Sequence, residues 1–102
     1  MGRQSRDKGA RTERAIVRLL QDRGFAAEKV SRMYKPGEDL SVPLLGRDLR
    51  IEVKCRASGF KFLYDAIEHR DALIVKADRR EALLVVRLSL GAEVASKAEG
   101  NK

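Results

Sequence analysis

Two acidic residues and a lysine lie near one another in the sequence, at positions that share one side of two alternating segments. Asp39 opens the first segment, and Glu52 and Lys54 belong to the second. Alternation of apolar and polar residues is typical of a β-strand with one buried face. Two carboxylates suit a hard cation such as Mg²⁺, and a lysine suits a phosphate. This set predicts metal-dependent hydrolysis of a phosphodiester bond.

The two segments, 39–44 and 49–54, are predicted to pair as a β-hairpin. In the predicted register the two residue numbers of each cross-strand pair add up to 93, which places the apolar residues of both strands on one face. This register closes through the loop 45–48, places Asp39 opposite Lys54, and leaves Pro43 at a non-hydrogen-bonded position beside a free edge. The alternative is that Glu52 and Lys54 are the solvated face of an ordinary amphipathic strand.

A helix is predicted from about Ser5 or Lys8 to Arg23, with Gly24 as its stop. At about 100° per residue, Glu13 lies roughly 20° from the apolar Leu20 and therefore points toward the core. An inward carboxylate is costly unless it is paired or bound to a metal ion. The alternative is a glutamate favoured by the helix dipole that reaches back to water. The predicted apolar stripe comprises Ile16, Val17, Leu19 and Leu20.

The combination of Asp39, Glu52-Val53-Lys54 and a helical Glu13 resembles the PD-(D/E)XK nuclease superfamily, and most of all its archaeal-type Holliday junction resolvases. The resemblance covers about residues 8–64. It departs from the family at Glu38, which replaces the proline that names the motif, and in the short chain after Tyr64.

This resemblance implies an α/β fold with a restriction-endonuclease-like core, in which a mixed central β-sheet is flanked by helices. It implies that Glu13, Asp39, Glu52 and Lys54 are catalytic and that the three acids bind the metal ion. The implied cofactor is Mg²⁺, for which Mn²⁺ is able to substitute.

Composition indicates a polyanionic partner. The 102 residues include 22 Lys and Arg against 15 Asp and Glu, a net charge of +7. Nucleic acid is favoured over a membrane because no long apolar run occurs. One cysteine excludes an internal disulfide, and with no targeting segment in view the expected location is the cytoplasm.

The expected organisation is a basic, weakly ordered arm at 1–12, one nuclease domain at 8–90 and a flexible tail at 91–102. Near-continuous apolar runs at 72–76 and 82–88 should close the sheet. Cys55 is expected in the core and His69 on the surface. The expected phosphate contacts, from the arm, the loop before Asp39 and the segment after Lys54, are Arg3, Arg6, Lys8, Arg11, Ser31, Arg32, Lys35, Arg56 and Lys61.

A homodimer is expected because a four-way junction needs two matched cuts and this chain has one candidate site. The apolar stretch from Phe60 to Ile67 is the candidate contact between subunits; the alternative is that it packs within one subunit. The resemblance thus predicts an endonuclease for branched DNA. The alternatives are a nuclease for another DNA structure and a basic nucleic-acid-binding module that does not cut.

Overall fold

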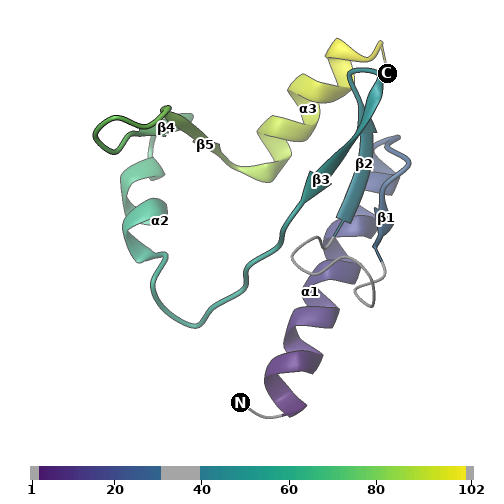
Figure 1. Ribbon diagram of the computed structural model, residues 1–102, viewed down its shortest axis with the longest axis horizontal. Helices are drawn as coiled ribbons and strands as arrows, with labels where there is room; N and C mark the ends of the chain where they lie inside the picture. The colour runs from purple at the N-terminus through teal and green to yellow at the C-terminus, as the bar shows by residue number, and fades with distance from the viewer. Residues whose placement is uncertain (1–2, 31–39, 101–102) are drawn as a thin grey trace. The chain divides into compact units, whose positions relative to one another are not determined.

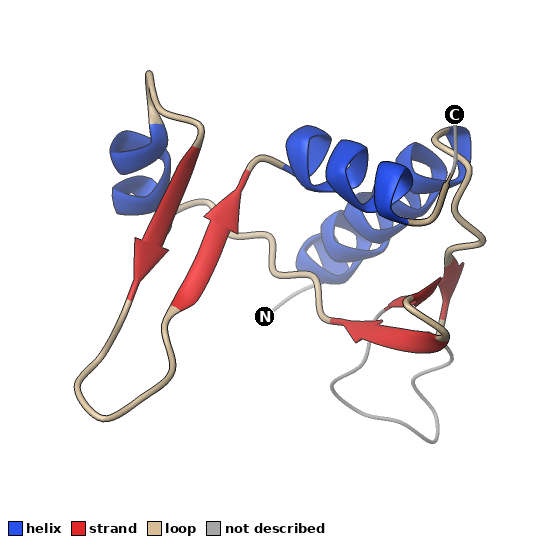
Figure 2. Ribbon diagram, turned by 90° about the horizontal axis from the view of Figure 1, so that it is seen from above, coloured by secondary structure: helices blue, strands red, loops and turns tan. Residues whose placement is uncertain are grey.

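A computed structural model describes residues 3–30 and 40–100 of the protein, with side chains from residue 9 onward. Over these residues the protein contains three helices and five strands (Figure 1). The expected α/β class is confirmed. The described strands form two antiparallel sheets, where one mixed sheet was predicted (Figure 2). In chain order the elements are α1 (Arg3–Asp22), β1 (Glu28–Lys29), β2 (Leu40–Leu44), β3 (Arg47–Ile51), α2 (Lys61–Ile67), β4 (Ala72–Val75), β5 (Leu83–Val86) and α3 (Leu88–Ala98).

The chain divides into two compact units. The first consists of Met1–Cys55 with Ala95–Lys102, and the second is Arg56–Val94. The division falls inside the range 8–90 that the sequence suggested as one domain. The first unit contains β1, β2 and β3 together with α1, and the second contains α2, β4 and β5.

Helix α1 ends at Asp22, one residue before the predicted Arg23, and Gly24 is its stop as predicted. The backbone N–H of Phe25 donates to the carbonyl of Leu20 at 3.0 Å, and that of Gly24 donates to the carbonyl of Gln21 at 3.0 Å. This pair of bonds is a Schellman motif, and the φ of 95° at Gly24 is one that glycine adopts without strain. At its other end the helix begins at Arg3, before the predicted start at about Ser5 or Lys8, so residues 3–12 of the expected weakly ordered arm lie within α1. Arginine, glutamine and lysine all have good helix propensity, which favours this extension.

The three-stranded sheet of the first unit has the order β1-β2-β3. Leu40 pairs with Ile51, so the paired numbers add to 91 and the predicted register of 93 is wrong. The turn causes the shift: only Leu45 and Gly46 separate the strands, with φ of 58° and 77°. Positive φ at both central residues is the conformation of a type I′ turn, which matches the twist of a hairpin.

The shift by two residues leaves each strand facing the predicted way, because side chains alternate with a period of two. Leu40 and Val42 of β2 are buried, whereas Pro43 is exposed. A two-residue loop makes the pair of Pro43 with Asp48 a non-hydrogen-bonded one. On its other side, over the residues that the structure describes, β1 pairs with β2 only as far as Ser41, so this part of the sheet has the predicted free edge beside Pro43.

The core of the first unit forms where α1 and the segment after it meet the sheet (Figure 1). Leu40 is fully buried at 0% exposure, at the centre of this small core. Burial of apolar side chains here removes surface from water and is the main driving force for the packing. The buried apolar residues of this unit that the structure describes are Leu20, Phe25, Ala27, Leu40 and Val42.

In the second unit β4 and β5 pair with each other, with Val75 opposite Leu83. They form a separate two-stranded sheet, so the prediction that these two runs close the sheet of the first hairpin is wrong. Helix α2 follows the expected amphipathic spacing and buries Ile67. The cross-strand neighbours Ile74 and Leu84 remain exposed, at 69% and 67%. One face of this two-stranded sheet is therefore apolar and open to solvent within the unit.

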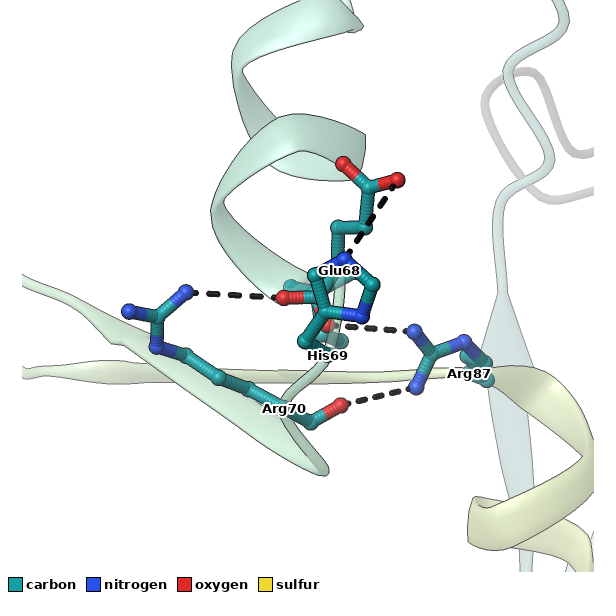
Figure 3. Close-up of polar contacts among 5 residues, drawn as sticks. Glu68, His69, Arg70 and Arg87 are labelled. Atoms are coloured by element: carbon teal, nitrogen blue, oxygen red, sulfur yellow. Dashed lines mark hydrogen bonds and ion pairs between the residues drawn. The ribbon is translucent and has the colours of Figure 1, made fainter.

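Arg87, which follows β5, forms hydrogen bonds with the backbone at the end of α2 (Figure 3). Its guanidinium group donates to the carbonyl of Ile67 at 3.1 Å and to the carbonyl of Arg70 at 2.9 Å. The last carbonyls of a helix lack partners within the helix and carry partial negative charge, so a cation is favoured there. His69, in the same turn, is exposed as predicted and has a φ of 64°.

Residues 88–98 form α3, so the expected flexible tail at 91–102 begins inside a helix. Ala92 is the buried residue that the structure describes on this helix. The carboxylate of Glu99 accepts a hydrogen bond from the backbone N–H of Leu45 in the β2–β3 turn at 3.3 Å. Over the residues described, none of the helices has the length and apolar character needed to cross a membrane.

Candidate active site

Glu13 is buried, as the helical periodicity predicted. Its exposed fraction is 5%, and it is the polar residue that the described core contains. The Nζ atom of Lys29 lies 3.4 Å from Oε1 of Glu13, and the lysine side chain is 43% exposed. Lys29 belongs to β1 and pairs across the sheet with Leu40. The pair therefore connects the inner face of α1 with the edge of the sheet.

Glu52 and Lys54 lie just beyond the end of β3. Their side chains form an ion pair, with Nζ of Lys54 3.5 Å from Oε2 of Glu52, and both are about half exposed. The ladder of β3 ends at Ile51, so these two residues occupy a segment outside it. An exposed pair of this kind contributes about 0–1 kcal/mol to stability, so it leaves both groups available to a ligand.

Asp39 lies outside the described residues, as do Ser31, Arg32 and Lys35. The predicted opposition of Asp39 to Lys54 required the register of 93, which the described ladder does not have. Among the described side chains, no three histidine, cysteine, aspartate or glutamate residues lie together as a metal-binding group. Glu13 and Glu52 offer carboxylate oxygens, which is the donor chemistry of a hard divalent cation.

The predicted phosphate contacts are distributed over both units. Arg11 of α1 is exposed, and so are Arg56 and Lys61 of the second unit. Lys61 forms an i,i+4 ion pair with Asp65 on α2. Arg3, Arg6 and Lys8 lie in the first part of α1, where the structure describes the backbone.

The sequence pattern did not indicate three residues of the first unit that the structure brings into view. Lys29 is the partner of Glu13, and Arg14 and Arg18 are exposed on α1 near Arg11. A two-residue strand gives no periodicity from which a contact of Lys29 could be predicted. The arginines could have been found by plotting their angles around the helix.

Cys55 was expected in the core, but it is exposed. The prediction extended the alternation of β3 beyond its end at Ile51. Past Ile51 the backbone lies outside the ladder. A position two residues after Val53 therefore need not have its side chain on the same face as Val53.

The contact between Glu13 and Lys29 predicts a measurable coupling. Lys29→Met should lower the free energy of unfolding by about 1–3 kcal/mol, because it removes a cation that lies 3.4 Å from a buried carboxylate. The double variant Glu13→Gln with Lys29→Met should recover part of that loss, and urea titrations of the four proteins give the coupling energy. Strictly additive losses would contradict an energetic link between the two side chains.

The chain was compared with family models, curated protein sequences and solved structures, and it matches none of them. The residues and their geometry are therefore the basis for assigning a function.

Proposed function

We propose that this protein is a Mg²⁺-dependent endonuclease that cleaves branched DNA, with a restriction-endonuclease-like core. The observation that carries the proposal is the buried Glu13, which lies at 5% exposure on the inner face of α1. A small core does not gain stability from a carboxylate that must be desolvated, so a residue of this type in this place favours a functional role. The order α1, β1, β2, β3 supports the proposed core.

In this proposal Glu13, Asp39 and Glu52 hold the divalent cation and Lys54 contacts the scissile phosphate. When bound, a divalent cation would supply Lewis-acid chemistry at the phosphate. The ammonium group of Lys54 stabilises negative charge that develops on the phosphate oxygens. Its distance of 3.5 Å from Glu52 supports this role, because the lysine and a proposed metal ligand are within reach of one substrate group.

The positive charge of the first unit supports DNA as the substrate. Residues 1–55 with 95–102 carry fifteen Lys and Arg against nine Asp and Glu, whereas residues 56–94 carry seven against six. The excess charge therefore belongs to the unit that contains the candidate site. Duplex DNA attracts such a surface by release of its counterions.

The homodimer remains part of the proposal. Phe62 and Tyr64 are exposed at 64% and 73%, whereas Ile67 is buried within its own unit. The exposed aromatics are available to a second copy of the chain, and the buried isoleucine is not. A non-cutting DNA-binding module is the second candidate function, favoured by the same charge and by the exposed Glu52–Lys54 pair.

A cleavage assay tests the proposal directly. Labelled linear, flap, fork and four-way DNA are incubated with the protein in Mg²⁺, Ca²⁺ or EDTA. We expect cutting in Mg²⁺ alone and fastest on branched DNA. Preference for a flap or fork would favour another nuclease, and binding without cutting in Mg²⁺ or Mn²⁺ would favour the binding module.

Lys54→Met provides the internal test of the mechanism. Removing the ammonium group should lower the single-turnover rate by about 10²-fold while DNA affinity changes little, because the group acts on charge that develops during the reaction. Lys97→Met on α3 removes the same charge at an exposed position outside the candidate site and is the matched control. A normal rate for Lys54→Met would exclude this lysine from catalysis.

A further inference from the structure

Three exposed arginines form a stripe on α1. Arg11, Arg14 and Arg18 have the spacing i, i+3, i+7, which at about 100° per residue places them within about 60° of one another around the helix axis. In the part of the chain that the structure describes, none of these guanidinium groups has an ion pair or side-chain hydrogen bond. Their charge is therefore available to a partner outside the molecule.

Neighbouring arginines of the stripe repel one another, and Asp22, four residues after Arg18 on the same side of the helix, offsets part of that repulsion. Like charges three and four residues apart on a helix repel one another by about 0.2–0.5 kcal/mol per pair. Arg11 with Arg14, and Arg14 with Arg18, are two such pairs. Phosphates would turn this repulsion into attraction, since a guanidinium group presents a planar set of donors that matches phosphate oxygens.

The stripe lies away from Glu13. On the same helical wheel Arg14 is about 100° from Glu13, Arg18 about 140° and Arg11 about 160°. Glu13 is buried on the inner face and the arginines are in solvent. An α-helix with its side chains is about 10–12 Å across, so the phosphate at a site built on Glu13 and the phosphates on the stripe are different ones.

The length of the stripe suits a DNA backbone. From Arg11 to Arg18 the helix rises about 10 Å, enough to follow two or three consecutive phosphates of one strand. A duplex held against the inner side of α1 would lie across the helix from the stripe, which is on the outer side of α1. A second duplex, or a second arm of a branched DNA, would reach it.

We propose that Arg11, Arg14 and Arg18 form a second duplex-binding surface, which holds a DNA arm other than the one held at the site of Glu13. The inference rests on the proposed function and adds to it a physical basis for choosing branched over linear DNA. The binding is to phosphates, so it carries no sequence preference.

The test uses binding in Ca²⁺ and in EDTA, so that it does not depend on cleavage. A triple variant, Arg11→Gln with Arg14→Gln and Arg18→Gln, is compared with the wild type on a four-way junction and on a linear duplex of one arm sequence. Glutamine is a good helix former, and circular dichroism verifies the fold. The control, Lys76→Gln with Arg79→Gln and Arg80→Gln, removes the same charge from exposed residues after β4.

For the stripe variant we expect junction affinity to fall by about 30-fold, with linear-duplex affinity within about 3-fold of wild type. The slope of log affinity against log salt on the junction should decrease by about 2–3, since each phosphate contact contributes about 0.9. The control variant should keep the junction preference.

Equal weakening on both DNAs, an unchanged junction affinity, or a wild type without junction preference would overturn the inference. The two proposals fail separately. A wild type that prefers junctions through the stripe but never cuts would refute the nuclease alone. A protein that cuts while the stripe variant binds junctions normally would refute the second surface alone.

Discussion

Glu52→Gln should abolish DNA cleavage while DNA binding stays the same or becomes tighter. The substitution keeps the shape of the side chain and removes the charge that would hold the divalent cation. A bound cation supplies several kcal/mol of transition-state stabilisation, so the expected loss is about 10³-fold or more in the single-turnover rate. Removing a negative charge from a surface that approaches phosphates should not weaken binding. We expect the same result for Asp39→Asn.

Asp48→Asn is the matched control for Glu52→Gln, because Asp48 is an exposed acid on β3 outside the proposed set. Single-turnover cleavage in Mg²⁺ and fluorescence anisotropy in Ca²⁺ measure the two properties separately. If Glu52→Gln lost binding and cleavage to the same extent, Glu52 would have a structural role instead.

Leu40→Ala should destabilise the first unit by about 2–5 kcal/mol, because it leaves a cavity at a fully buried position. Small domains have only about 5–15 kcal/mol of stability in total, so the change should be visible as a large decrease in the urea midpoint. Leu45→Ala on the same hairpin is the control. Leu45 is 68% exposed, and we expect its replacement to change stability by less than about 0.5 kcal/mol. Equal midpoints for the two variants would contradict the described core.

The sequence predicted the elements of the hairpin but not its register, and the reason is physical. The alternation of apolar residues determines which face of the sheet each side chain takes. Registers whose paired residue numbers add up to 91 or to 93 give the same faces, so the alternation does not distinguish them. The choice between them depends on the turn. Leucine is a poor residue for a position with a φ of 58°, so Leu45-Gly46 lacked the Asn-Gly or Asp-Gly pattern that usually predicts a two-residue loop.

The candidate site was predicted where it depends on helical periodicity and missed where it depends on tertiary contacts. Glu13 could be placed in the core from its angle to Leu20 alone. Its partner Lys29 comes from a two-residue edge strand, for which neither pattern nor propensity gives a signal. Helix α3 was missed because its sequence is rich in small residues and buries Ala92 with no long apolar stripe.

The exposed thiol of Cys55 determines how the assembly of this protein can be measured. It is the single cysteine of the chain, so two copies can be joined by one intermolecular disulfide when reductant is absent. Such a covalent pair would have the mass of the proposed homodimer in light scattering without any packed interface. Mass measurements therefore need reductant or a Cys55→Ser variant. The same thiol gives a unique attachment point for a maleimide fluorophore, next to Lys54 and at the boundary of the two units.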